Sequence, residues 1–151
     1  MSSNAKLLIG RVILTVIAVG TIVSPYIADW NATHIYSPLW PPHAKFHNAQ
    51  TMVLGVMLGV SGSLFLWRRK GGGADLVPAI VLIALYWVSQ LPAFLFPGVA
   101  WTDPNLLQAG QSLADVPIQL KGDIVLFPLM ILGSWLALRG SADRLADSMP
   151  L

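Results

Sequence analysis

Four long runs of apolar residues, separated by short polar stretches, make up most of the chain. The hydrocarbon core of a bilayer is about 30 Å thick, and a helix needs about 20 apolar residues to cross it. Each run is about that long and carries few charged side chains, so each predicts one membrane-spanning helix. The predicted spans are residues 7–28, 46–67, 76–99 and 118–138. We therefore expect a single domain, an all-α four-helix transmembrane bundle.

Prolines and polar stretches predict where these helices begin, bend and end. Pro41 and Pro42 suit a helix start, so the second helix should begin there. Pro92 lies within the third span, where it should kink the helix and free a backbone carbonyl near Val88. Two further segments are predicted to be short: residues 105–116 as an amphipathic surface helix, and the polar tail SADRLADSMPL as a short helix or a disordered end.

Small residues recur on one face of the second span. Gly55, Gly59 and Ser63 are four positions apart. Small side chains at this spacing let two helix backbones approach closely in lipid. Packing inside the bundle is the simpler interpretation, and a homo- or hetero-oligomer formed through this face is the alternative.

Composition supports a membrane protein and excludes several chemistries. The chain is 55% hydrophobic and 11% charged, whereas soluble domains carry about 25% charged residues. It has no cysteine, which excludes disulfides, thiolate ligands and iron–sulfur clusters. The pI of about 9.2 reflects basic residues at the flanks of the spans, so we expect contact with membrane lipids and no nucleic-acid partner.

The basic residues also predict the orientation. On one side lie Lys6, Arg11, Arg68, Arg69, Lys70, Arg139 and Arg144. Lys45 and Lys121 lie on the other side. Cytoplasmic loops carry the excess of basic residues, so both termini are predicted to be cytoplasmic and residues 29–48 to be non-cytoplasmic. Such a protein would sit in a bacterial inner membrane or a eukaryotic endomembrane.

The chemistry is concentrated in residues 29–48, DWNATHIYSPLWPPHAKFHN, which hold all three histidines of the chain. His43 and His47 are one helical turn apart, a spacing that lets two imidazoles converge on one metal ion. With His34 and Asp29 they form a predicted set of metal ligands for zinc, copper, iron or manganese.

Two residues outside this set could support it. Asp123 enters from the fourth span on the same side, as a further ligand, an acceptor for an imidazole N–H or a proton acceptor. Asp123 and His34 are therefore the candidate catalytic residues. Gln50 continues the face of His43 and His47.

Other interpretations of the histidine stretch remain open. It could be a rigid structural cap, or a small-molecule or lipid site in which histidine donates hydrogen bonds or transfers protons. The resulting functions are a metal-dependent site that binds or acts on a lipophilic small molecule, a non-enzymatic subunit of a larger membrane complex, and a channel or transporter. No histidine lies inside the first, third or fourth span, which argues against a haem held between helices.

The stretch ADWNATHIYSPLWPPHAKFHNAQTM resembles a family of small four-span membrane proteins of bacteria and fungi. Their shared pattern is D-x-N-x-T-H followed by W-P-P-H-A, a basic residue and F-H-N, and the similarity covers roughly residues 28–59. The family is one of unknown function. The resemblance implies a single functional unit made of Asp29, Asn31, His34, Trp40, His43, His47 and Asn48.

Overall fold

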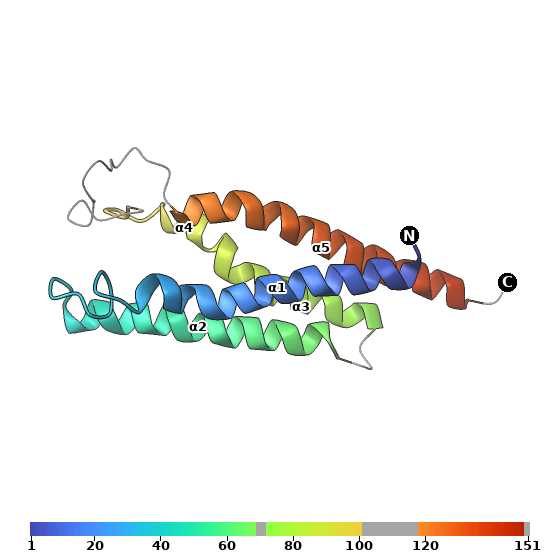
Figure 1. Ribbon diagram of the computed structural model, residues 1–151, viewed down its shortest axis with the longest axis horizontal. Coiled ribbons are helices and arrows are strands. Elements are labelled where there is room, and N and C mark those ends of the chain that lie inside the picture. Colours follow the sequence, from blue (N-terminus) through green and yellow to red (C-terminus); the bar gives the residue numbers. More distant parts are fainter. Residues whose placement is uncertain (69–71, 101–117, 150–151) are drawn as a thin grey trace.

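The computed structural model describes residues 1–68, 72–100 and 118–149, and its described part is helical with short connections (Figure 1). The elements are α1 (Ser3–Asp29), α2 (Pro42–Leu66), the 3-10 helix η1 (Gly72–Asp75), α3 (Leu76–Val88), α4 (Gln90–Ala93) and α5 (Ile118–Ser148). Residues 105–116, predicted as a surface helix, lie outside the described residues.

The helices form one elongated bundle, which confirms the predicted all-α, four-span fold. Four helical segments are long and apolar enough to cross a membrane: Ser3–Asp29, Pro42–Leu66, Gly73–Ala93 and Gln119–Ser148. Helix α1 begins and α5 ends at the same end of the bundle, which we call the terminal end (Figure 1). The loop between α1 and α2 lies at the opposite end, which we call the loop end.

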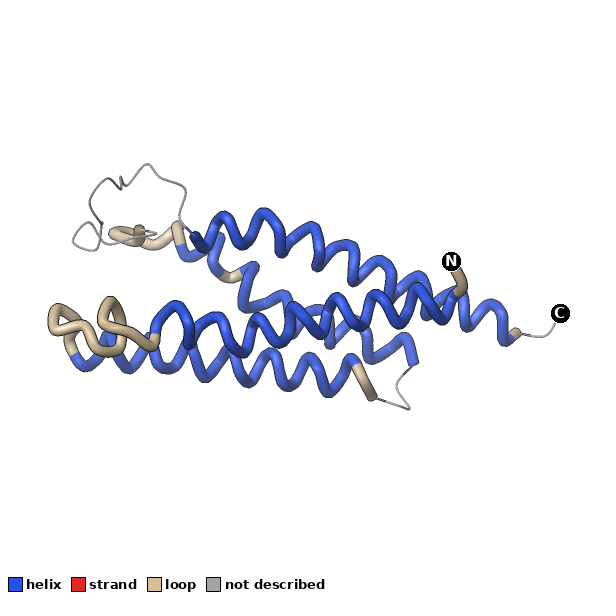
Figure 2. The backbone as a smooth tube through the Cα atoms, viewed as in Figure 1, coloured by secondary structure: helices blue, strands red, loops and turns tan. Residues whose placement is uncertain are grey.

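Proline determines the shape of two helices near the loop end. Helix α2 begins at Pro42, with Pro41 as its N-cap, as the sequence predicts. Helix α3 ends at Val88, and Ser89 separates it from the short α4, a break that appears as a tan segment in Figure 2. Pro92 has no N–H to bond the Val88 carbonyl, so the predicted kink is confirmed.

At two points the observed helices differ in length from the predicted spans. The third span was expected to reach residue 99, but regular helix ends at Ala93 and turns follow it. The fourth was expected to end at residue 138, but α5 continues to Ser148 and absorbs the polar tail. Polar contacts with α1 account for the extension, because Lys6 pairs with Asp143 at 2.8 Å and the Ser3 hydroxyl donates to Asp147 at 3.1 Å.

Helix α1 is the centre of the bundle, and glycines bring its neighbours close to it. A Cβ added at Gly10 would lie 2.6 Å from the Gly133 carbonyl oxygen of α5. A Cβ added at Gly55 would lie 2.7 Å from the Thr21 carbonyl oxygen. A Cβ added at Gly59 would lie 2.7 Å from the Ala18 carbonyl oxygen. Gly55 and Gly59 therefore pack against α1 inside the bundle, which agrees with the simpler of the two interpretations of this helix face.

A mainly apolar core joins α1, α2, α3 and α5. Leu14, Leu66, Leu76 and Ile83 have no exposed surface. Helix α5 packs mainly against α1 and touches α3 much less. The bundle is thus tightly packed through its middle and more open between α3 and α5 near the loop end, where the α3–α4 break lies.

Replacing Gly10 by valine should destabilise the fold strongly. The new side chain would enter the backbone of α5, and overpacking of this kind costs about 1–3 kcal/mol or more. The measurement is the unfolding midpoint of the detergent-purified protein. Gly122→Ala is the matched control, because a Cβ there meets no atom within 4 Å. Equal midpoints for the two variants would contradict the close α1–α5 contact.

Candidate functional site

The loop that follows α1 is tightly folded by its own polar groups. The Asp29 carbonyl accepts hydrogen bonds from the backbone N–H groups of Asn31 (2.9 Å) and Ile35 (3.2 Å). The Asn31 side-chain oxygen accepts from the Thr33 N–H at 2.8 Å and from the Thr33 hydroxyl at 2.6 Å. Asparagine and threonine are suited to such local turns. The loop therefore holds its side chains in fixed positions beside the end of α1.

The Asp29 carboxylate joins three parts of the chain. It is the last residue of α1, and its Oδ2 accepts a hydrogen bond from Nδ2 of Asn48 on α2 at 2.7 Å. Its Oδ1 lies 3.7 Å from Nε2 of His34 in the loop, and the side chains of His34 and Asp29 are 29% and 18% exposed. Asp29 thus connects α1, α2 and the loop through one carboxylate.

The His34 ring is oriented by contacts on its other sides. Its Nδ1 lies 2.7 Å from the Thr33 hydroxyl. The ring also packs edge-on against Trp40, with centroids 4.9 Å apart. These contacts leave Nε2 as the ring nitrogen directed at Asp29. At 3.7 Å the two groups are close enough for an ion pair when the imidazole is protonated, but too far apart for a hydrogen bond.

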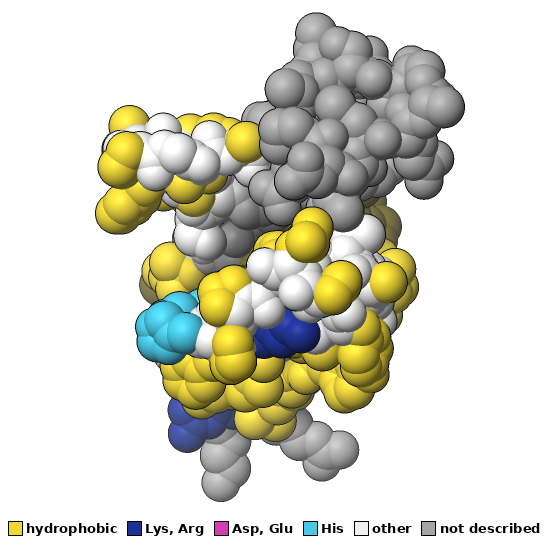
Figure 3. Space-filling model, turned by 90° about the vertical axis from the view of Figure 1, so that its left-hand side faces the viewer, with side chains coloured by type: hydrophobic (Ala, Val, Ile, Leu, Met, Phe, Trp, Pro, Cys, Tyr) yellow, Lys and Arg dark blue, Asp and Glu magenta, His cyan; other side chains and the backbone are white. Residues whose placement is uncertain are grey.

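His43 and His47 form a second, separate pair on the exposed side of α2. Their Nε2 atoms are 3.1 Å apart, and Nδ1 of His47 lies 3.2 Å from the side-chain oxygen of Gln50. Figure 3, which looks onto the loop end, shows histidine as a cyan patch at the rim of this face. The expectation that both imidazoles share one helix face is confirmed.

The four predicted metal ligands therefore fall into two pairs. Asp29 lies with His34, and His43 lies with His47. Within residues 1–68, 72–100 and 118–149, no group of three or more potential ligands is placed to hold one metal ion. The rotation of α2 is the reason: Asn48 is directed toward α1, and its neighbour His47 is exposed.

A cavity of about 390 Å³ lies beside Asp29, between α1, α3, α4 and α5. Its lining residues are Ser24, Pro25, Ala28, Asp29, Tyr86, Trp87, Gln90, Gln119 and Gly122. One wall is fixed by the Trp87 indole, whose N–H donates to the Thr21 hydroxyl at 2.8 Å. Apolar walls with a few polar groups at one end are typical of small-molecule sites.

The candidate catalytic residue Asp123 lies beside this cavity and away from the histidines. It follows the lining residue Gly122 and is 2% exposed. Neither of its carboxylate oxygens has a hydrogen-bond partner within the described residues. A buried carboxyl group without a partner is costly to stability. The expected contact between Asp123 and an imidazole does not occur among these residues.

A second cavity, of about 530 Å³, lies on the other side of α3, against α2. It shares Tyr86 and Gln90 with the first cavity, and its other lining residues are Thr51, Leu54, Leu58, Leu85, Ser89 and Ala93. Tyr86, Ser89 and Gln90 are the polar group just before the Pro92 kink. The helix break thus separates two cavities.

Sequence reasoning missed Gln119 and Gly122, although their spacing places them on one face of α5.

Removing the Asn48 side chain should weaken the link between α1 and α2. The change Asn48→Ala leaves a carboxylate oxygen of Asp29 without its partner, at a cost of about 1–3 kcal/mol. The free energy of unfolding of the purified protein measures this cost. Thr51→Ala is the control, because among the described residues the Thr51 hydroxyl bonds to the His47 carbonyl of its own helix and to no other helix. A loss no greater than that of the control would show that the Asp29–Asn48 bond contributes little.

The sequence matches one known family. The family described as "Family of unknown function (DUF6640)" matches residues 13–133, which cover most of the chain. No curated protein and no solved structure matches the chain.

Proposed function

We propose that this chain, which belongs to the family of unknown function DUF6640, binds a lipophilic small molecule at the loop end. The cavity between α1, α3, α4 and α5 would hold the molecule. Its polar head would donate hydrogen bonds to Asp29. The observation that carries the proposal is that Asp29 both lines this cavity and is held in place by Asn48 and oriented beside His34.

The lining of the cavity supports this class of ligand. Pro25, Ala28 and Trp87 offer apolar walls, and the side chains of Gln90 and Gln119 add polar groups. A carboxylate only accepts hydrogen bonds when it is ionised. The head of the ligand is therefore proposed to be an amine or a hydroxyl, and the rest of the molecule to be apolar.

The surroundings of Asp29 explain why it is suited to the role. Asn48 occupies its Oδ2 and fixes the carboxylate plane, and Oδ1 faces His34 at 3.7 Å, beyond hydrogen-bond length. An oxygen with this geometry can accept a further donor from the cavity.

The orientation in the membrane is part of the proposal. Basic residues lie at the terminal end, where Lys6, Arg68 and Arg144 belong to the ends of α1, α2 and α5. The excess of basic residues marks the cytoplasmic side. The loop end and its cavity would then face the non-cytoplasmic side, and the ligand would arrive from that leaflet.

The Asp29→Asn variant should bind a lipophilic amine at least about tenfold more weakly, a change of about 1.4 kcal/mol. Asparagine keeps the oxygen that accepts from Asn48, so the fold is retained while the charge is lost. The measurement is quenching of tryptophan fluorescence by dodecylamine, with dodecanoic acid for comparison. The unmodified protein should prefer the amine, because the acid would place a second carboxylate beside Asp29.

A second variant tests the cavity itself. Gly122→Leu places a side chain into open space and should also weaken dodecylamine binding about tenfold or more. Val125→Leu adds bulk on the same helix at a position that is 61% exposed and should leave binding unchanged. Equal affinities for amine and acid, or affinity unaffected by either cavity variant, would overturn the proposal.

A second candidate function is metal binding by the His43–His47 pair. The observation in its favour is the 3.1 Å separation of the two Nε2 atoms on an exposed helix face. Zinc, copper, iron and manganese all accept imidazole nitrogen, and water can complete the coordination. Such a site would use two of the four predicted ligands, without Asp29 and His34.

Elemental analysis of the purified protein, after equilibration with each of the four metals, tests this candidate. His47→Ala should reduce the bound metal to background, because one imidazole alone is a weak ligand. His34→Ala should leave the metal content unchanged. Loss of metal in both variants would instead indicate one shared site, and background metal in the unmodified protein would rule out the site.

A further inference from the structure

The terminal end carries a cavity of a different character, about 310 Å³ in volume. Three of its lining residues are arginines: Arg11 of α1, Arg68 after α2 and Arg144 of α5. The other lining residues are Leu7, Gly73, Ser141, Leu145 and Ser148. Arginines of α1, of α5 and of the segment after α2 therefore line one cavity, within a chain of low overall charge.

The described residues neutralise these positive charges only in part, since one of the three arginines has an acidic partner. Arg68 forms an ion pair with Asp75 at 3.8 Å, which is longer than a hydrogen bond. Arg144 forms no ion pair within the described residues. The nearby acidic side chains of α5 have other partners, since Asp143 pairs with Lys6 and Asp147 accepts from Ser3. Like charges gathered around one cavity repel one another unless an anion lies between them.

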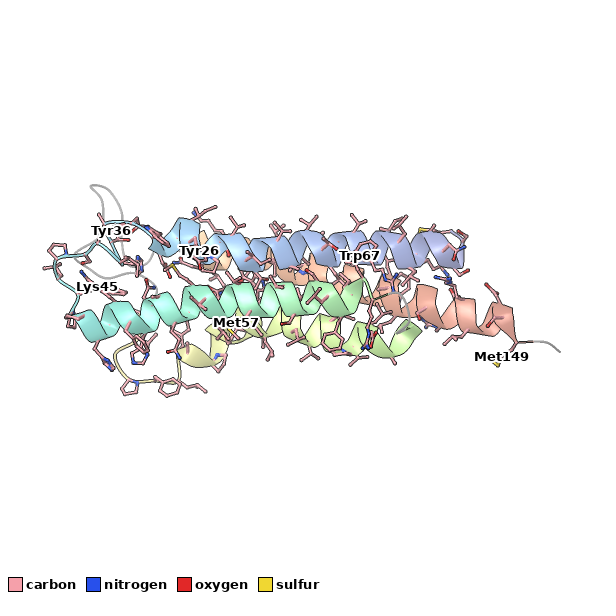
Figure 4. All side chains as sticks on the ribbon, turned by 90° about the horizontal axis from the view of Figure 1, so that it is seen from below. Tyr26, Tyr36, Lys45, Met57, Trp67 and Met149 are labelled. Atoms are coloured by element: carbon pink, nitrogen blue, oxygen red, sulfur yellow. The ribbon has the colours of Figure 1, made fainter. Side chains whose placement is uncertain are left out.

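Arg11 gives the most direct sign of a missing partner. Its Nε is buried and has no hydrogen-bond partner within the described residues. The guanidinium lies over the Trp67 ring, 5.7 Å from the ring centroid, and the indole N–H of Trp67 donates to Thr15 at 2.8 Å. Trp67 is labelled in Figure 4, at the end of α2. Arg11 is thus held in place, with a buried donor that nothing in the described chain satisfies.

Two small residues complete the cavity wall. Ser141 is 8% exposed and brings a hydroxyl, a hydrogen-bond donor that suits an oxyanion. Gly73 faces it, and a Cβ added there would lie 2.8 Å from the Ser141 oxygen. Glycine at this position therefore leaves the hydroxyl accessible from the cavity.

We propose that this cavity is an anion site for a phosphate group, bound by Arg11, Arg68 and Arg144. Guanidinium groups match phosphate oxygens in geometry and charge, and they bind them with paired hydrogen bonds. The phosphate could belong to an anionic lipid headgroup of the adjoining leaflet or to a free phosphate ion. Both sources present the same chemistry to the three arginines.

The test compares Arg144→Gln with Arg139→Gln in the full-length protein. Both variants lose one positive charge from α5 at exposed positions, but Arg139 does not line the cavity. One arm measures the shift of the unfolding midpoint with inorganic phosphate, against chloride at equal ionic strength. The other uses native mass spectrometry to count phosphatidylglycerol retained by the protein, against phosphatidylcholine with the same acyl chains.

The unmodified protein and Arg139→Gln should bind alike, and Arg144→Gln about tenfold more weakly. Arg11→Gln is a second variant that should show the same loss. A response to phosphatidylglycerol alone identifies a lipid headgroup, and a response to inorganic phosphate identifies the free ion. Equal binding by Arg144→Gln and Arg139→Gln would overturn the proposal. Anion binding would then depend only on the overall positive charge of the terminal end. Failure of both probes to bind would also overturn it.

Discussion

The close approach of α5 and α2 to α1 is the constraint on which the rest of the structure depends. In lipid, apolar side chains gain little by leaving the surrounding hydrocarbon, so helix association relies on tight packing. Gly10, Gly55 and Gly59 provide it, because each lies so close to a backbone atom of the neighbouring helix that any side chain would collide with it. Helix α1 is thereby held between α2 and α5. Each of its ends lines a cavity, one beside Asp29 and one beside Arg11.

The gap between α3 and α5 follows from the same arrangement. Because α5 packs mainly against α1, and α3 mainly against α2, contacts between α3 and α5 are sparse among the described residues. The break at Ser89 widens this region, since the chain no longer continues as a straight helix. The loop-end cavity therefore follows from the close packing of α5 on α1 and of α3 on α2. Asp29 of α1 lines this cavity.

Much of the fold could be predicted from the sequence because its signals are local. Apolar length predicts four helices, and the proline rules predict the start at Pro42 and the kink before Pro92. The site was predictable only in parts: Asp29 with His34, and His43 with His47, are near neighbours in sequence. Whether the two pairs would meet depends on the rotation of α2, which is determined by Asn48 reaching Asp29. The contributions of Gln119 and Gly122 were hidden because they depend on how α5 lies against α1, a long-range feature.

The length of α1 has a consequence for where the protein can reside. Arg11 and Asp29 are 18 positions apart, about 27 Å along a helix at 1.5 Å per residue. This is close to the roughly 30 Å thickness of the hydrocarbon layer. In a bilayer of that thickness, each charged end would lie at a boundary between lipid headgroups and tails, and both cavities would be open sideways to the bilayer. A much thicker membrane would draw one of these charges into hydrocarbon, so bilayer thickness itself would help to select the compartment in which this chain is stable.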